Sequence, residues 1–350
     1  MIKVDNSAKK RVFCNSDKKE VLDLKQKVIE KIEEIEKTTK NYNELTVFER
    51  ELYIDTISVF KFKKLIDKQI TNLLRSKLSD DFKEELRTLK NDLYFILVAD
   101  INTIKNYLKT KIALNSLLIH QGDKKLKSSD FKKYQKKFET LYSENLSNIK
   151  SSFKRPFFDL FEDINVCPYC NRNFINPIYK EHSLSGDNKN QSPDIEHFYP
   201  KSIYPFLSLS ISNLLPSCSF CNKIKSDVDT YKYNCLSPYE IKKNDFRFDF
   251  KFKSNQVKEV KLMSKEPRCK NSEILNLESL YNEVHNKQIN EIFDDILKYP
   301  KSYKRSLGKF KLTESDYKKI FRNYYDERDF NKHPLSKMTK DLYNQINGLI

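Results

Sequence analysis

Two Cys-x-x-Cys pairs constrain the fold of this chain more than any other feature. They are Cys167-Pro-Tyr-Cys170 and Cys218-Ser-Phe-Cys221, and they frame a single segment. A spacing of two residues lets both sulfurs of a pair reach one ion from a tight turn, and two pairs supply the four thiolates that Zn²⁺ prefers. Because four protein ligands close the coordination shell, we predict a structural zinc whose binding contributes directly to folding.

The composition favours a metal site over disulfides, and a polyanion as partner. The N-terminal segment lacks the apolar stretch of a secretory signal, and no run approaches the roughly 20 apolar residues of a membrane span. We therefore expect a cytoplasmic protein with no membrane contact, in which thiols stay reduced. The 65 Lys and Arg residues exceed the 49 Asp and Glu residues, for a net charge of +16. That excess favours nucleic acid, although a lysine-rich, well-solvated surface would give the same charge.

Helical periodicity dominates the first part of the chain. Apolar residues three or four positions apart predict helices over 18–37, 46–77 and 80–110, and a fourth that begins near Ser128 and Ser129. Asp80 and Asp81 suit the positive N-terminal end of the third helix. The predicted fold class is therefore mainly α, with a helical bundle over residues 1–155.

The pattern changes at Pro156, and until about residue 240 prolines, asparagines and cysteines cluster without a helical period. Next, Phe246, Phe248, Phe250 and Phe252 alternate with charged residues, which predicts a half-buried strand. A turn at Ser254–Asn255 would lead into a partner strand over 257–263, with the aromatic row packed in the core. Helical spacing returns from residue 272. We predict a zinc-bound region over 156–240, then a hairpin and helices over 241–350.

The segment between the cysteine pairs combines acidic, histidine and asparagine residues. It contains Asp194-Ile-Glu196-His197-Phe-Tyr-Pro200-Lys201 and Asn213-Leu, and the second pair continues into Asn222-Lys-Ile-Lys225. This order resembles the HNH (His-metal finger, ββα-metal) endonuclease family, over roughly 65 residues. The resemblance implies a β-hairpin followed by a helix, with Asp194–His197 on the first strand, Asn213 in the loop and Asn222 on the helix.

The chemistry of phosphodiester hydrolysis needs these residue types. A water must be deprotonated near neutral pH, and a cation must face the charge that grows on the phosphate. We expect His197 to act as the general base, and Glu196, Asn222 and Asp194 to hold Mg²⁺ or Mn²⁺. The resemblance implies that Asn213 orients His197. Lys201 and Lys225 are candidates for phosphate contacts. The other histidines have no such context and are predicted to be ordinary core or surface residues: His120, His182, His285 and His333.

These observations predict a metal-dependent endonuclease that acts on DNA, although the residues alone permit RNA. Similarity to effectors of bacterial anti-phage systems suggests an ATPase or another defence-system protein as partner, and the helical flanks could also form a homo-oligomer. The alternative is a non-catalytic zinc-ribbon module that binds nucleic acid or scaffolds a complex. That module would keep the four cysteines but would not need Glu196, His197, Asn213 and Asn222 together.

Overall fold

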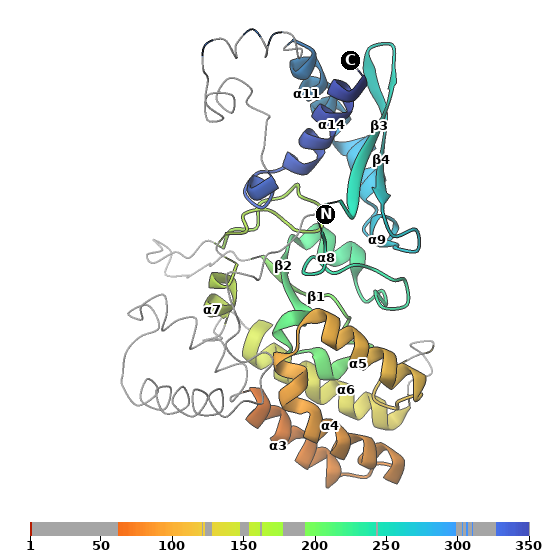
Figure 1. Cartoon of the computed structure of the whole chain (residues 1–350). Coiled ribbons are helices and arrows are strands. Elements are labelled where there is room, and N and C mark those ends of the chain that lie inside the picture. The colour runs from red at the N-terminus through yellow and green to blue at the C-terminus, as the bar shows by residue number, and fades with distance from the viewer. Residues whose placement is uncertain are drawn as a thin grey trace, which may run out of the picture.

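The structure is a computed structural model that describes Met1 and residues 62–120, 122, 128–147, 154–161, 163–177, 193–242, 244–298, 303, 306, 310 and 327–349. The helix predicted over 18–37 and the first part of that over 46–77 lie outside these residues. The described elements are mainly helical, with two separate two-stranded sheets, as predicted for the fold class. Figure 1 shows three layers along the long axis of the molecule: the helices α3 to α6, then a hairpin with α8, then a second hairpin with α11 and α14.

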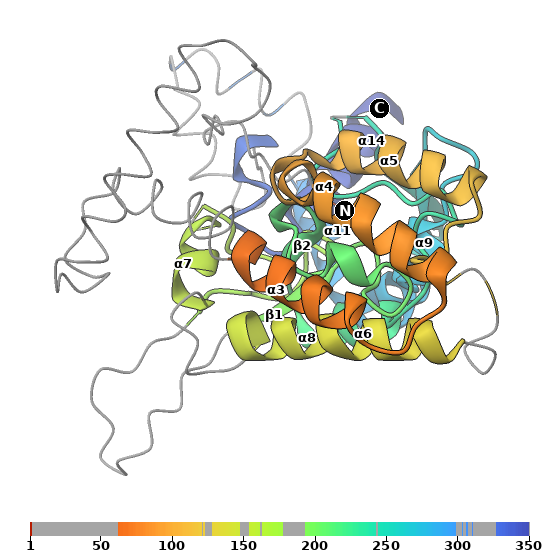
Figure 2. The same cartoon turned by 90° about the horizontal axis from the view of Figure 1, so that it is seen from below.

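The first layer consists of four amphipathic helices whose apolar faces are buried. Figure 2 shows these helices from below, at the near end of the molecule. Their ranges are α3 (Phe62–Leu74), α4 (Asp80–Val98), α5 (Ile101–Ala113) and α6 (Ser129–Tyr142). The predicted cap of the fourth helix is confirmed, because the Ser128 side chain accepts a hydrogen bond of 3.1 Å from the Phe131 N–H. Phe131, Tyr134 and Phe138 are buried on its inner face, as their spacing predicts.

The single helix predicted over 80–110 was wrong, because the structure has two helices there. Asp100 separates them in an extended conformation, and its carboxylate accepts a hydrogen bond of 2.7 Å from the Thr103 N–H. A short acidic side chain that bonds the backbone in this way favours the start of a new helix over the continuation of the old one. The break turns the chain back, so that the Tyr107 hydroxyl of α5 donates to the Asp92 carboxylate of α4 at 2.9 Å.

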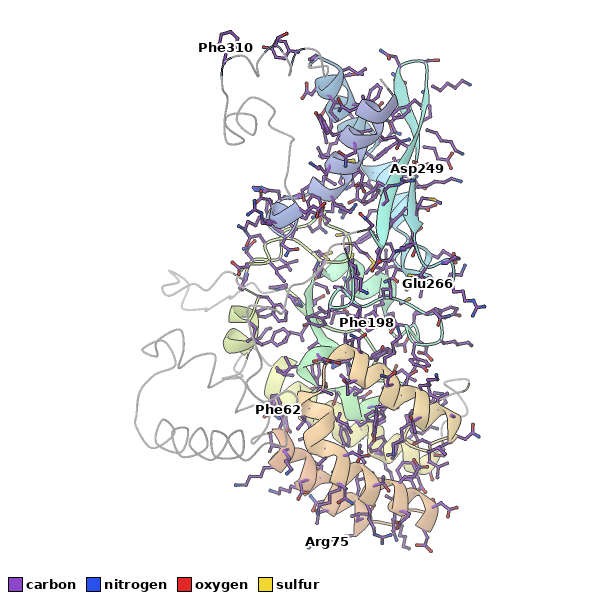
Figure 3. The ribbon with its side chains drawn as sticks, viewed as in Figure 1. Phe62, Arg75, Phe198, Asp249, Glu266 and Phe310 are labelled. Carbon is purple, nitrogen blue, oxygen red and sulfur yellow. The ribbon has the colours of Figure 1, made fainter. Side chains whose placement is uncertain are left out.

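The second layer contains the segment with the nuclease-like motif. Strand β1 (Asp194–His197) pairs antiparallel with β2 (Leu214–Ser217), and α8 (Ser219–Lys225) follows at once. The two strands are joined by a loop that includes 3₁₀ turns at Pro205–Leu207 and Ile211–Asn213. This loop is attached to the helical layer, since the Ser210 hydroxyl donates to the Ile96 carbonyl at 3.0 Å and the Ser212 hydroxyl to that of Ala99 at 2.6 Å. Phe198, labelled in Figure 3, lies buried at the start of the loop.

The third layer contains the predicted hairpin, which the structure confirms. Strand β3 (Phe246–Lys253) pairs antiparallel with β4 (Gln256–Ser264). The turn residues Ser254 and Asn255 have φ angles of 51° and 59°, which suit the right-handed twist of a two-residue hairpin loop. The first three phenylalanines of β3 are each 2% exposed, so the aromatic row is core, as expected.

Side-chain amides cover both outer edges of this hairpin, which a two-stranded sheet would otherwise leave unpaired. On β3, Gln345 of α14 (Ser336–Leu349) accepts from the Phe250 N–H and donates to its carbonyl. On β4, Asn282 makes the same pair of bonds with Val260, each 2.7 Å long. Asn290 of α11 (Asn286–Lys298) repeats the arrangement at Val257. Side chains from the helices therefore bond the free backbone N–H and C=O groups of the edge strands, as a third strand would.

Asn171, which directly follows the first cysteine pair, joins the second layer to the third. Its backbone adopts a φ of 49°, and its side chain is fully buried. The carbonyl oxygen of its amide accepts a hydrogen bond of 3.0 Å from the Lys337 N–H, in the first turn of α14. The amide nitrogen donates to the Phe330 carbonyl at 2.8 Å. The turn beside Cys170 therefore caps the C-terminal helix.

Short elements complete the described chain, and α7 crosses the boundary that the sequence suggested at residue 155. None of the helices among the described residues combines the length and the apolar character needed to span a membrane. The short elements are α7 (Lys154–Asp159), α9 (Asn271–Ile274), α10 (Leu277–Ser279), the π-helical turns Ser143–Ser147 and Leu280–Val284, and the 3₁₀ turn Glu327–Asp329.

Candidate functional site

The four paired cysteines come together in one buried cluster, as predicted. All four Sγ atoms lie within 4.8 Å of one another, and Cys170 and Cys218 are 3.9 Å apart. A tetrahedral zinc with Zn–S bonds of about 2.3 Å separates its sulfurs by about 3.8 Å. The cluster therefore has the donor set and the size for one zinc ion, with no position left for a substrate.

The chain folds around this cluster through local hydrogen bonds. The first pair lies in a tight turn, closed by the bridge between Val166 and Phe174 and by the bond from the Cys167 N–H to the Asn173 carbonyl at 2.9 Å. The second pair is at the N-terminus of α8, where the Cys218 N–H donates to the Cys167 sulfur at 3.5 Å. Burial raises the pKa of the Cys167 thiol, so a cation is needed to hold that sulfur as a thiolate.

A pocket of about 680 Å³ lies beside β1, between the hairpin and the helical layer. Its wall includes five of the residues selected from the sequence: Asp194, Glu196, His197, Lys201 and Asn222. The helical layer adds Glu139 and Tyr142 from α6, and Lys154 comes from α7. These three residues could not be found from the sequence, because they are far from the motif along the chain and Tyr142 has the spacing of a core residue.

His197, at the end of β1, is fixed as a neutral ring with one nitrogen available. Its Nε2 lies 3.0 Å from the Ser208 carbonyl, which can only accept, so Nε2 carries the proton and Nδ1 keeps its lone pair. Burial, and then the nearby charge of Lys201, lower the pKa of His197 to about 3. The ring is therefore uncharged at neutral pH, as a proton acceptor must be.

Among the described residues, Asn213 makes no hydrogen bond to the His197 side chain, and the orienting role that the resemblance implied stays a prediction. Its amide oxygen accepts from the Tyr199 N–H at 2.7 Å, and its nitrogen donates to the carbonyls of Tyr199 and Leu207 at 3.0 and 3.2 Å. These bonds close the loop between β1 and β2 from inside. Because Leu207 precedes Ser208, these bonds help to set the position of the Ser208 carbonyl that faces the His197 ring.

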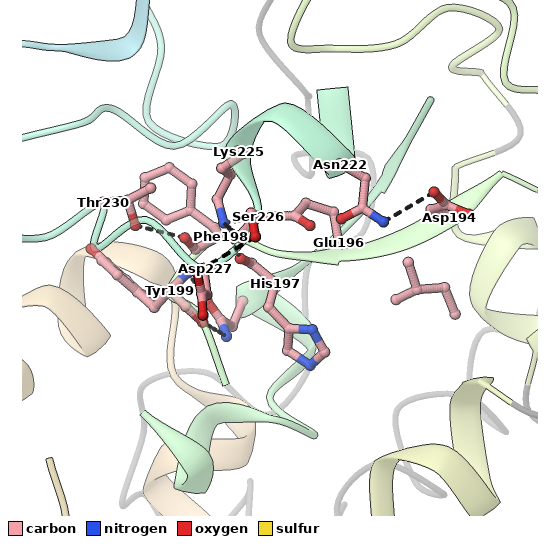
Figure 4. A network of polar contacts seen from close by, with 12 residues as sticks. Asp194, Glu196, His197, Phe198, Tyr199, Asn222, Lys225, Ser226, Asp227 and Thr230 are labelled. Atoms are coloured by element: carbon pink, nitrogen blue, oxygen red, sulfur yellow. Dashed lines mark hydrogen bonds and ion pairs between the residues drawn. The ribbon is translucent and has the colours of Figure 1, made fainter. Parts of the chain in front are cut away.

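Asn222 and Asp194 form a hydrogen-bonded pair in the wall of the pocket (Figure 4). The Asn222 side chain donates from its nitrogen to the Asp194 carboxylate at 3.0 Å, from α8 across to the start of β1. Within the described part of the chain, no hydrogen bond reaches the Asn222 amide oxygen. One carboxylate and one amide oxygen are donors suited to a hard, hydrated cation such as Mg²⁺.

Glu196 forms a buried ion pair with Lys225. This pairing corrects the prediction that Lys225 contacts phosphate. The two side chains are buried, their charged atoms lie 2.5 Å apart, and Lys225 also donates to the His197 carbonyl at 2.9 Å. Lys225 faces the hairpin from the last turn of α8, so its ammonium is inside the protein. Burial raises the pKa of Glu196 despite the attraction of Lys225. Glu196 lines the pocket, but it would have to leave Lys225 to ligate a metal.

This buried ion pair leads to a stability prediction. Lys225→Met should lower the free energy of unfolding by about 3–5 kcal/mol, because it leaves a buried carboxylate without its partner. Glu196 is then favoured in its protonated form, so the loss should grow as the pH rises further above the ordinary glutamate pKa and shrink toward the lowest pH at which the zinc stays bound. Urea unfolding of the zinc-loaded protein at several pH values measures the effect.

Two further variants control this experiment. Lys223→Met removes an exposed lysine from the same helix and should change the unfolding free energy by less than about 0.5 kcal/mol. The double variant Glu196→Gln/Lys225→Met removes both charges and should recover most of the loss. Equal stability of Lys225→Met and the wild type would show that the pair contributes nothing to the fold.

Comparison with known proteins gives one match. No protein-family model matches the chain, and no solved structure matches it. The chain is similar to the Septu protein PtuB of Bacillus thuringiensis, with 32% identity over 101 residues. The matched part covers 28% of this chain and 35% of PtuB, so the chain spans about a third of the length of that relative.

Proposed function

We propose that this chain is a metal-dependent HNH-type endonuclease that hydrolyses phosphodiester bonds in DNA. The observation that carries the proposal is the pocket, in which a neutral His197 lies on the same wall as the Asp194–Asn222 pair and Lys201. A proton acceptor, hard oxygen donors and an ammonium group are what hydrolysis of a phosphodiester needs. These groups come from β1, from the loop that follows it and from α8, and α8 begins at the cysteine cluster.

Each residue has a distinct part in the proposed reaction. The Ser208 carbonyl keeps the Nε2 proton of His197 in place, so that Nδ1 can take the proton of the attacking water. Asp194 and Asn222 would hold a Mg²⁺ or Mn²⁺ ion, which supplies charge against the phosphate and a more acidic water. Because His197 is a weak base at its lowered pKa, the proposal depends on that increase in acidity. Lys201 would contact the phosphate.

The net charge and the similarity to a known protein bear on the substrate and the biological setting. The net charge of +16 suits any nucleic acid, and DNA is favoured by the resemblance to HNH nucleases. The similarity to the Septu protein PtuB supports a place in bacterial anti-phage defence. An ATPase or another defence-system partner remains the sequence-based expectation. The ion pair of Glu196 and Lys225 favours the rival proposal of a non-catalytic zinc module, since it occupies one predicted metal ligand.

Cleavage by the wild type separates these proposals. The zinc-loaded protein is incubated with supercoiled plasmid and, separately, with a single-stranded RNA, with Mg²⁺, with Mn²⁺ or with EDTA added briefly before the reaction. We expect nicked and linear plasmid with either ion and none with EDTA, while the bound zinc remains at one per chain. Cleavage of the RNA but not of the plasmid would show that the substrate is RNA rather than DNA. Binding of both nucleic acids without cleavage under any condition would favour the non-catalytic zinc module.

A further inference from the structure

We propose that Tyr142, at the end of α6, is a positioning residue that holds the His197 ring and the Lys201 ammonium in place within the pocket. The proposal deepens the proposed nuclease function and rests on it for its catalytic meaning. It assigns the helical layer a direct part in the site, because α6 belongs to that layer and β1 does not. Nothing in the motif of the second layer predicts such a contribution.

Three contacts of Tyr142 carry the inference. Its hydroxyl donates to the Ile195 carbonyl on β1 at 3.1 Å, which fixes the ring against the strand. The ring meets the His197 imidazole edge to face, with centroids 4.5 Å apart and an interplanar angle of 65°. The Lys201 ammonium lies over the same ring, 4.9 Å from its centroid. One side chain thus contacts the proposed base, its strand and the proposed phosphate contact.

A second contact on the His197 ring matters because a single hydrogen bond does not fix the orientation of the ring. The bond from Nε2 to the Ser208 carbonyl fixes which nitrogen bears the proton, but the ring can still tilt about that bond. An aromatic ring packed against the imidazole restricts this tilt and fixes the direction in which Nδ1 points. Misplacement of a reacting group by about 1 Å can slow a reaction by a hundredfold, so this restriction is large enough to matter.

The same ring limits where Lys201 can place its charge. A lysine ammonium is attracted to the face of an aromatic ring, and more strongly where water is partly excluded. Tyr142 is 7% exposed and lines the pocket, so the ammonium is kept at the wall rather than in open solvent. Loss of the ring would release Lys201 and weaken substrate binding, whereas loss of the hydroxyl alone would not.

Two substitutions at Tyr142 separate these contributions. Tyr142→Phe keeps the ring contacts with His197 and Lys201 and removes only the bond to Ile195, so kcat should fall by less than about threefold. Tyr142→Leu removes the ring, so kcat should fall by about 10- to 100-fold, and KM should rise. Phe138→Leu is the matched control: it removes a buried ring one turn earlier on α6, and that ring does not line the pocket. Its kcat should stay near that of the wild type.

A spectroscopic measurement tests the inference without any cleavage. In the full zinc-loaded chain with ¹³C,¹⁵N-labelled histidine, the His197 signals are assigned by their loss in His197→Ala. We expect a protonated Nε2 and a bare Nδ1 in the wild type, in Tyr142→Phe and in Phe138→Leu. Tyr142→Leu should keep a protonated Nε2 but show broadened His197 ring signals, because the ring then samples several tilts about its bond to the Ser208 carbonyl. An unchanged His197 signal in Tyr142→Leu would overturn the inference, as would a kcat equal to that of the wild type.

The two measurements also keep the inference apart from the proposed function. If no variant and no wild type cleaves nucleic acid, the nuclease proposal fails, while the response of the His197 signal still decides whether Tyr142 holds the ring. If the wild type cleaves and Phe138→Leu loses as much kcat as Tyr142→Leu, the effect is one of helix packing, and the positioning role is contradicted.

Discussion

The Cys221→Ser variant is expected to lose its zinc and with it the folded second layer of the protein. Structural zinc bound by cysteines contributes about 10–16 kcal/mol of apparent binding free energy, as much as the whole stability of a typical domain. A serine hydroxyl does not replace a thiolate, and the remaining sulfurs would lie close together and buried without a cation. The hairpin with the pocket and the turn that caps α14 both depend on this cluster.

Metal analysis and unfolding measure this expectation. The wild type should contain one zinc per chain, and Cys221→Ser close to none, with a loss of helical circular dichroism and of cooperative unfolding. Cys235→Ser is the control, because Cys235 is also buried but lies outside the cluster. It should keep its zinc and lose no more than about 2 kcal/mol. A stable, cooperatively folded Cys221→Ser protein without zinc would show that the cluster does not hold the fold together.

The features that the sequence predicted well are those that depend on neighbouring residues. The cysteine spacing fixes the local turns, and the alternation from Phe246 to Phe252 fixes a strand whose turn residues accept positive φ angles. Ser128 caps α6 because a serine before an amphipathic stretch can bond the free N–H groups of the first turn. In each case the signal lies within a few residues of its effect.

The features that were missed depend on which elements pack together. Lys225 has the same type of side chain as Lys223, and only the packing of α8 on β1 makes one an internal partner of Glu196 and leaves the other at the surface. Asn213 turns into the loop because the Tyr199 and Leu207 backbone groups need partners there. Tyr142 reaches the site from another layer. No spacing along the chain encodes these contacts.

His197→Ala should reduce cleavage by about a thousandfold while leaving the fold intact. Removal of a general base typically lowers kcat by 10²–10⁴, and metal-bound water with the remaining donors would account for the residual rate. The loss should appear in kcat rather than in KM, because the ring takes a proton during the reaction and does not hold the substrate. Plasmid nicking with Mg²⁺ under single-turnover conditions measures it, with zinc content and unfolding as controls for structure.

A second histidine makes the comparison specific to the pocket. His285 is also buried, but it lies in the third layer and its ring nitrogen bonds Gln288. His285→Ala should therefore nick plasmid within about twofold of the wild-type rate, apart from any small loss of stability. If His197→Ala and the wild type nick equally while both keep their zinc, the imidazole has no part in the reaction, and any proton must leave the water by another route. A selective loss in His197→Ala would instead place the chemistry at Nδ1, because Nε2 is committed to the Ser208 carbonyl and no other imidazole lines the pocket among the described residues.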